Sequence, residues 1–216
     1  MGRASYELEK SELSFELPAK KANPRGRLAR ATGRFEIDLE NAERSTGSVR
    51  VDLASLEMES SATEGDTANA TRRALEWLEL GAELAADQRE LRRFATFEVR
   101  GLEGPAGRSI AGLRARRDGR PPRLDATVTG DLSLHGVRAP LRVPVSLEIE
   151  PAEGDAGPPR KLVIRSQKPL VVSLGVHDIR PRDARGVLVA RELTLLGENV
   201  GRDAKVSFEL TLALTP

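Results

Sequence analysis

Residues 130–145 constrain the fold of this chain more than any other segment. They read Gly-Asp-Leu-Ser-Leu-His-Gly-Val-Arg-Ala-Pro-Leu-Arg-Val-Pro-Val. Apolar and polar residues alternate up to the pair His135-Gly136, and the alternation resumes after Pro140 and continues to Ile149. A period of two places the apolar side chains on one face of a strand. The segment therefore predicts two antiparallel strands joined by a tight corner, each with one buried face.

Comparable alternation recurs along most of the chain. The apolar sets are Leu13, Phe15 and Leu17; Phe35, Ile37 and Leu39; Val49, Val51 and Leu53; Phe94, Phe97 and Val99; Ala126 and Val128; Leu170, Val172, Leu174 and Val176; Val187 and Val189; Leu193 and Leu195; and Val206 to Leu214. Several short strands separated by turn residues are typical of a closed or nearly closed antiparallel sheet. We therefore expect a single all-β domain over residues 1–216.

One segment breaks the alternation. Residues 71–91 place Leu75, Leu78, Ala82 and Ala85 at helical spacing. Thr71 is the expected N-cap of this helix, and Gly81 is a point at which it would divide into two pieces.

A second interruption, residues 103–123, is rich in glycine and proline and predicts an inserted loop or a long hairpin tip. The arginines at 108–123 fit two interpretations, a solvated loop or a grip on an anionic partner. Residues 151–159 predict a further loop.

Composition excludes several classes of protein. The net charge of +1 and the low aromatic content, 3%, argue against nucleic-acid binding. The absence of cysteine removes thiol catalysis, disulfides and cysteine-ligated metals. No apolar run approaches the length of a membrane span, about 20 residues, so we do not expect an integral membrane protein. No phosphate loop or nucleophile elbow is present, and we expect no cofactor.

The chain has two histidines, His135 and His177. His135 could act as a general base, anchor a ligand head group, or satisfy a carbonyl at the corner. His177 is followed by Asp178, but adjacent strand residues face opposite sides, so this pair needs a turn to act together. Two distant histidines without ligand-spaced carboxylates do not predict a metal site.

The corner also resembles a known family. Gly130, Asp131, Leu132, His135, Gly136, Val137 and Pro140 stand where the YceI-like lipid/polyisoprenoid-binding proteins typically read Gly-Asp-Leu-Thr-Ile-His-Gly-Val-Thr-Lys-Pro. The resemblance implies an eight-stranded lipocalin-like antiparallel barrel that holds an isoprenoid or other long lipid without chemistry, with a short helical excursion often over one end. This chain lacks the family's usual Arg-x-x-His-Leu and Pro-Asp-Phe-Phe segments there.

The resemblance also implies a periplasmic or secreted protein. The start of this chain carries no signal peptide, so a cytoplasmic location stays open. Exposed strand edges would allow a homodimer, which nothing in the sequence requires.

On this interpretation, one set of residues is expected to contact the ligand: Phe15, Phe35, Val51, Trp77, Phe97, Leu132, Leu134, His135, Val143, Val145, Leu174 and Phe208. Trp77 fits either core packing or the ligand mouth. The first alternative is a ligand-free barrel, filled by its own side chains, that serves as a protein-interaction or scaffold module. The second is an enzyme in which His135 or His177 converges with Asp131, Asp178 or Asp183 in a pocket.

Overall fold

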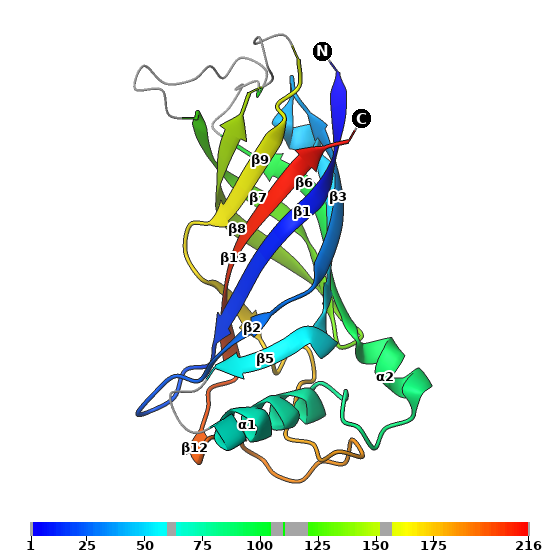
Figure 1. Cartoon of the computed structure of the whole chain (residues 1–216), viewed down its shortest axis with the longest axis vertical. Coiled ribbons are helices and arrows are strands. Elements are labelled where there is room, and N and C mark those ends of the chain that lie inside the picture. Colours follow the sequence, from blue (N-terminus) through cyan, green and yellow to red (C-terminus); the bar gives the residue numbers. More distant parts are fainter. Residues whose placement is uncertain (1, 60–63, 105–109, 111–120, 152–156, 216) are drawn as a thin grey trace.

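The long strands of the chain close into a barrel (Figure 1). The computed structural model describes residues 2–59, 64–104, 110, 121–151 and 157–215. Eight antiparallel strands follow the order β13-β9-β8-β7-β6-β4-β3-β1, and the pairing of β1 with β13 closes the ring. They are β1 (Arg3–Glu16), β3 (Ala31–Asp38), β4 (Thr46–Asp52), β6 (Phe94–Glu103), β7 (Arg123–Leu134), β8 (Val137–Glu150), β9 (Lys161–Ser166) and β13 (Asp203–Leu214). The expected all-β barrel is confirmed.

Short elements extend the barrel at its lower end in Figure 1. The strands β2 (Arg25–Leu28), β5 (Leu56–Glu59) and β10 (Leu170–Ser173) lengthen the wall, and β11 (Thr194–Leu195) with β12 (Glu198–Asn199) forms a separate hairpin. The helices α1 (Glu64–Trp77) and α2 (Ala86–Arg92) lie at the same end. Single 3₁₀ turns occupy Ala42–Arg44 and Leu53–Ser55.

The corner between β7 and β8 is a two-residue turn. Leu134 pairs with Val137, and the two residues between them, His135 and Gly136, have φ of 53° and 81°. Positive φ at both central positions is the geometry that matches the twist of antiparallel strands, and glycine adopts it without strain. The corner predicted from the sequence is thereby confirmed.

Two bulges set which residues face the interior. The register of β1 against β13 shifts between Leu8 and Lys10, and that of β6 against β7 shifts between Val99 and Gly101. One extra residue reverses the in-and-out order of the side chains that follow. The interior side of β1 therefore changes from even-numbered residues such as Tyr6 to odd-numbered ones such as Phe15.

The upper part of the barrel is filled by its own side chains. Leu147, Leu162 and Leu212 are at most 1% exposed and belong to one continuous apolar cluster with Tyr6. The Tyr6 hydroxyl donates a hydrogen bond of 2.9 Å to the carbonyl of Pro159. Burial raises the pKa of Tyr6 to about 12, so its phenol stays neutral.

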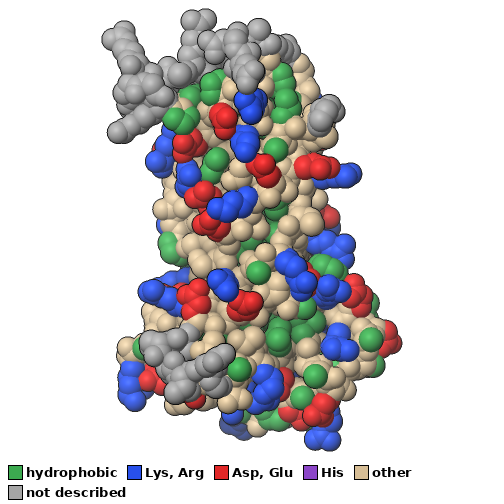
Figure 2. Space-filling model, viewed as in Figure 1, with side chains coloured by type: hydrophobic (Ala, Val, Ile, Leu, Met, Phe, Trp, Pro, Cys, Tyr) green, Lys and Arg blue, Asp and Glu red, His purple; other side chains and the backbone are tan. Residues whose placement is uncertain are grey.

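The outer wall carries charges of both signs, which alternate over its surface (Figure 2). Many are cross-strand pairs, as when Arg165 on β9 bonds Glu209 at 2.7 Å and Glu148 at 2.6 Å. Such exposed pairs favour the register while adding little stability.

Some expectations of local structure are wrong. Thr71 lies inside α1 and does not cap it; its side-chain oxygen instead accepts a hydrogen bond from the Met58 amide, which ties α1 to β5. Val176, Val187 and Val189 are exposed and belong to no named strand, because no neighbouring strand pairs with them. The division of the helical segment near Gly81 is confirmed.

The insertion expected at 103–123 falls between the end of β6 and the start of β7. Apart from Ile110, which is buried in the upper core, residues 105–120 lie outside the described residues, as do 152–156 of the second loop.

Candidate functional site: an apolar cavity in the lower barrel

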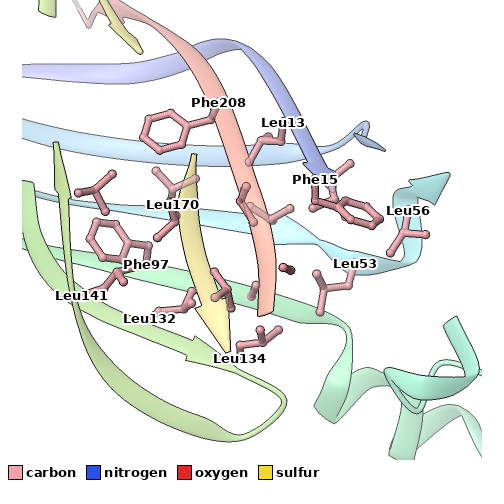
Figure 3. A pocket seen from close by; sticks show the side chains of 18 of the residues that line it. Leu13, Phe15, Leu53, Leu56, Phe97, Leu132, Leu134, Leu141, Leu170 and Phe208 are labelled. Carbon is pink, nitrogen blue, oxygen red and sulfur yellow. The ribbon is translucent and has the colours of Figure 1, made fainter. Parts of the chain in front are cut away.

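A cavity of about 240 Å³ occupies the lower half of the barrel. Its wall consists of apolar side chains from strands all around the ring, and Figure 3 shows Phe208, Phe97, Leu132 and Leu170 converging on it. Apolar cavities of about 150 Å³ remain dry and take up apolar guests, because water finds no hydrogen-bond partner in them. The site is therefore suited to an apolar ligand.

Nearly all of the residues expected to contact a ligand line this cavity. They are Phe15, Phe35, Val51, Trp77, Phe97, Leu132, Leu134, Val143, Val145, Leu174 and Phe208. His135 is not among the lining residues. The structure thus brings together eleven of the twelve, and their contact with a ligand stays a prediction.

Other lining residues were missed by the sequence prediction. Leu13 and Val99 belong to the alternating sets of Phe15 and Phe97 and could have been found by extending the ligand set along them, whereas Ile164 lies on β9, a strand that the sequence did not predict. Leu53 ends an expected alternating set but lies on a 3₁₀ turn, and Leu78 stands at helical spacing but lies on the turn after α1. Leu56, on a short strand, gave no signal.

The lower end of the cavity is closed by α1 and the residues that follow it. Ala74, Trp77 and Leu78 line the cavity from this side, and Ile179 lines it from the loop after β10. We call residues 64–85, which include Ala74, Trp77 and Leu78, the lid segment. Trp77 is 6% exposed and forms part of both the lid segment and the apolar core beneath it.

The rings of His135 and His177 each contact a main-chain carbonyl at or beside the other histidine. The His135 Nδ1 lies 3.1 Å from the carbonyl oxygen of His177, and the His177 Nδ1 lies 3.2 Å from that of Leu134. Both side chains are buried, at 3% exposure. The rings therefore clamp the β7–β8 corner to the turn that follows β10.

Glu79 completes this buried polar cluster from the lid segment. Its Oε2 lies 2.8 Å from the His135 Nε2 and 3.2 Å from the Arg92 Nε, and its Oε1 lies 3.7 Å from Arg182. Arg92 also donates to the His135 carbonyl at 2.7 Å. The cluster links the lid segment, α2, the corner and the loop after β10. Nothing in the sequence marks Glu79 for this position.

Backbone strain is concentrated in the same place. Glu79, His135 and Asp178 have φ between 53° and 57°, and the only other described non-glycine residue with positive φ is Leu196. Such conformations persist only where surrounding contacts hold them. The polar cluster supplies those contacts.

The three aspartates considered for acid–base chemistry are held by arginines or by main-chain amides. Asp131 lies on the barrel wall between Arg100 and Arg138. Asp178 bonds Arg180 and Arg182, while Asp183 accepts from nearby amides, which lowers its pKa. Within the described part of the chain, no hydrogen bond joins these carboxylates to a histidine ring. The convergence required by the enzyme alternative is therefore not observed there.

Acid is expected to weaken the clamp at His135. Burial is the main cause that lowers the pKa of His135. The positive charges of Arg92 and Arg182 lower this pKa further, whereas the negative charge of Glu79 raises it. The unfolded chain then binds a proton that the folded chain resists, so stability is lost as pH falls below the ordinary histidine pKa of about 6.5. We expect H135N to unfold with less dependence on pH between about 6.5 and 5, measured by thermal denaturation. Asparagine suits the turn at this position, so the variant should fold.

No helix among the described residues is both long and apolar enough to cross a membrane. No group of three or more histidine, aspartate or glutamate side chains in the described part of the chain could hold a metal ion.

The closed ring and its internal cavity define a β-barrel protein with an apolar chamber. The chain belongs to the YceI-like family, because the model of the YceI-like domain matches residues 6–212. Among curated proteins, none matches the sequence.

Two solved structures share this fold. A polyisoprenoid binding domain from Saccharophagus degradans, implicated in plant cell wall breakdown, aligns over 98% of this chain and 99% of its own, with a TM-score of 0.62 and 15% identity. BcnA of Burkholderia cenocepacia aligns over 93% of this chain and 95% of its own, with a TM-score of 0.54 and 14% identity. At this level of identity, the likeness concerns the fold.

Proposed function

We propose that this protein binds or carries a long apolar molecule, an isoprenoid or another lipid, inside the barrel and without chemical conversion. The observation that carries the proposal is the cavity of about 240 Å³, which is lined throughout by apolar side chains. Each methylene group buried there would contribute about 0.8 kcal/mol before the costs of association. A long chain can repay those costs, whereas a short one cannot.

Two further observations support this proposal. The family is the YceI-like family, and a structural neighbour is described as a polyisoprenoid binding domain. The buried histidines, which an enzyme would need, are engaged with main-chain carbonyls outside the cavity wall.

The first test is chemical extraction of the purified protein. We expect organic solvent to release a prenyl or acyl species in near-stoichiometric amount, identified by mass spectrometry. The protein should be purified from a lipid-rich host without detergent, so that exchange does not empty the cavity. A clean extract under these conditions would contradict the proposal and favour a barrel that acts through its surface.

The second test uses Trp77, the single tryptophan of the chain, as a reporter. Because Trp77 lines the cavity, its fluorescence should change saturably when geranylgeraniol, an isoprenoid alcohol, is added to the delipidated protein. Free geraniol, the short analogue, is the matched control and should bind much more weakly.

A further inference from the structure

The large apolar side chains that are exposed gather at one end of the protein. Among the described residues they are Leu91, Val171, Val176, Val187, Leu188, Val189 and Leu196, all at least 43% exposed. Val171 lies on β10, in the barrel wall, and the other six lie on α2 and on the loops and hairpin that follow β10, at the lower end in Figure 1. Scattered apolar residues are normal on a surface, but the gathering of six of the seven at the end that α1 covers indicates an interaction surface.

The tip of the β11–β12 hairpin is unusual in two ways. Leu196 occupies a turn position with φ of 52°, followed by Gly197 with φ of 78°. Turns of this kind favour asparagine, aspartate or glycine, since a bulky side chain is strained there. Leu196 is also 43% exposed, so it gains little from burial. Folding alone does not account for a leucine at this tip.

Arginines lie directly beside these apolar residues. Arg72 and Arg73 of α1 line one hollow of about 240 Å³ together with Val189, and a second of about 510 Å³ together with Leu196. Figure 2 shows hydrophobic and basic side chains together at this end. Glu76 and Glu192 also line the first hollow, and Glu76 pairs with Arg72.

Among the described residues, two of the arginines at this end have no carboxylate partner. Residues 180–191 contain four arginines and one aspartate, although the whole chain carries a net charge of only +1. Arg180, Arg182 and Arg185 have carboxylate partners. In the described part of the chain, no ion pair engages Arg73 or Arg191, and both are exposed.

We propose that this end of the barrel docks on the surface of an anionic lipid bilayer. The docking face consists of Val187, Leu188, Val189 and Leu196, which enter the apolar boundary, and of Arg73 and Arg191, which bind lipid phosphates. Arginine pairs well with phosphate, and its stem packs on apolar surface while the head stays polar. Apolar insertion combined with attraction to anionic lipid is the pattern of reversible interfacial binding.

The proximity of the docking face to the cavity supports a lipid bilayer as the partner of this face. Trp77 lines both the apolar cavity and the hollow that contains Val189. The docking face therefore lies across the lid segment from the chamber, where a long apolar ligand would leave or enter a membrane. This inference rests on the proposed function for its purpose, but its test does not depend on a ligand.

The test is co-flotation of the purified protein with phosphatidylcholine vesicles, with and without phosphatidylglycerol. We expect binding to the anionic vesicles that weakens as salt is raised. The pair of substitutions L188E and L196N should reduce the bound fraction at least about tenfold. Because asparagine relieves the strain at position 196, L196N alone should raise the unfolding temperature while it weakens vesicle binding. The pair R73A and R191A should weaken binding and flatten the salt dependence.

Matched controls lie outside the docking face. V171E changes an equally exposed valine on the barrel wall, and R34A removes an exposed arginine of β3. Both should bind vesicles as the unsubstituted protein does. Near-UV circular dichroism and geranylgeraniol capture, read from Trp77, establish that each variant is folded.

The outcomes separate the two proposals. Geranylgeraniol capture without vesicle binding would overturn docking and leave the proposed function intact, whereas vesicle binding without capture would support docking and overturn the carrier role. Vesicle binding that L188E and L196N leave unchanged would overturn the docking face. Self-association in sedimentation experiments that these substitutions abolish, with no vesicle binding, would assign the face to a second copy of the chain.

Discussion

Filling the cavity with one aromatic ring, in the variant A204F, is expected to weaken geranylgeraniol binding at least about tenfold, equivalent to about 1.4 kcal/mol. Ala204 of β13 is 6% exposed and lines the cavity beside its strand partner Val172. The added ring would occupy space that the ligand needs, and filling a cavity does not cost stability. We therefore expect an unfolding temperature equal to or above that of the unsubstituted protein, with binding measured by Trp77 fluorescence.

The same change in the upper barrel is the matched control. Ala126 of β7 is similarly buried, at 8% exposure, but belongs to the filled core and does not line the cavity. Overpacking a filled core costs about 1 to 3 kcal/mol. A126F should therefore destabilise the protein and leave affinity unchanged below its melting temperature. Equal destabilisation by A204F and A126F would contradict the presence of usable space near Ala204.

Removing the charge of Glu79 is expected to loosen the lid segment. In E79Q, Arg92 and His135 lose a carboxylate within about 3.2 Å, and Arg182 loses one of its two. Removing one partner of a buried ion pair costs about 3 to 5 kcal/mol, and Glu79 is partly exposed, so we expect destabilisation by about 2 kcal/mol. Because the cluster is outside the cavity wall, a bound chain should leave faster while the wall that contacts it stays unchanged.

The control for this prediction lies four residues further along. Glu83 is 63% exposed in its side chain and reaches Arg185 only at 3.8 Å, so E83Q should change stability by less than about 0.5 kcal/mol. Hydrogen exchange measured over residues 64–85 should accelerate in E79Q and not in E83Q. Equal exchange in both variants would show that the cluster does not hold the lid segment in place.

The sequence predicted the parts of the barrel that depend on local pattern. The corner at His135 and Gly136 was predictable because a two-residue turn between alternating strands fixes the register by itself. Val187 and Val189 show where the same reasoning fails. Their alternation indicates a strand, but a strand also needs a partner, and these residues lie exposed in a loop.

The site was predictable only in part, for two physical reasons. Inward-facing apolar residues such as Val145 and Leu147 follow one pattern, yet Val145 lines the cavity and Leu147 belongs to solid core. Whether space is left between strands depends on packing around the whole ring. The polar cluster depends on contacts far apart in sequence, since the rings of His135 and His177 reach across 42 and 43 residues.

The filled upper barrel closes the upper end of the chamber. Val145, Ile164 and Leu210 line the cavity, while Leu147, Leu162 and Leu212, two residues away on the same strands, are 1%, 0% and 0% exposed. If the chamber holds a guest chain as proposed, the chain can extend upward only as far as these leucines, and any further length must remain outside. The barrel would then select guests by the number of carbon atoms that fit below the leucines. Enlarging or shrinking the leucines at 147, 162 and 212 would shift that length limit without altering the lower end of the cavity.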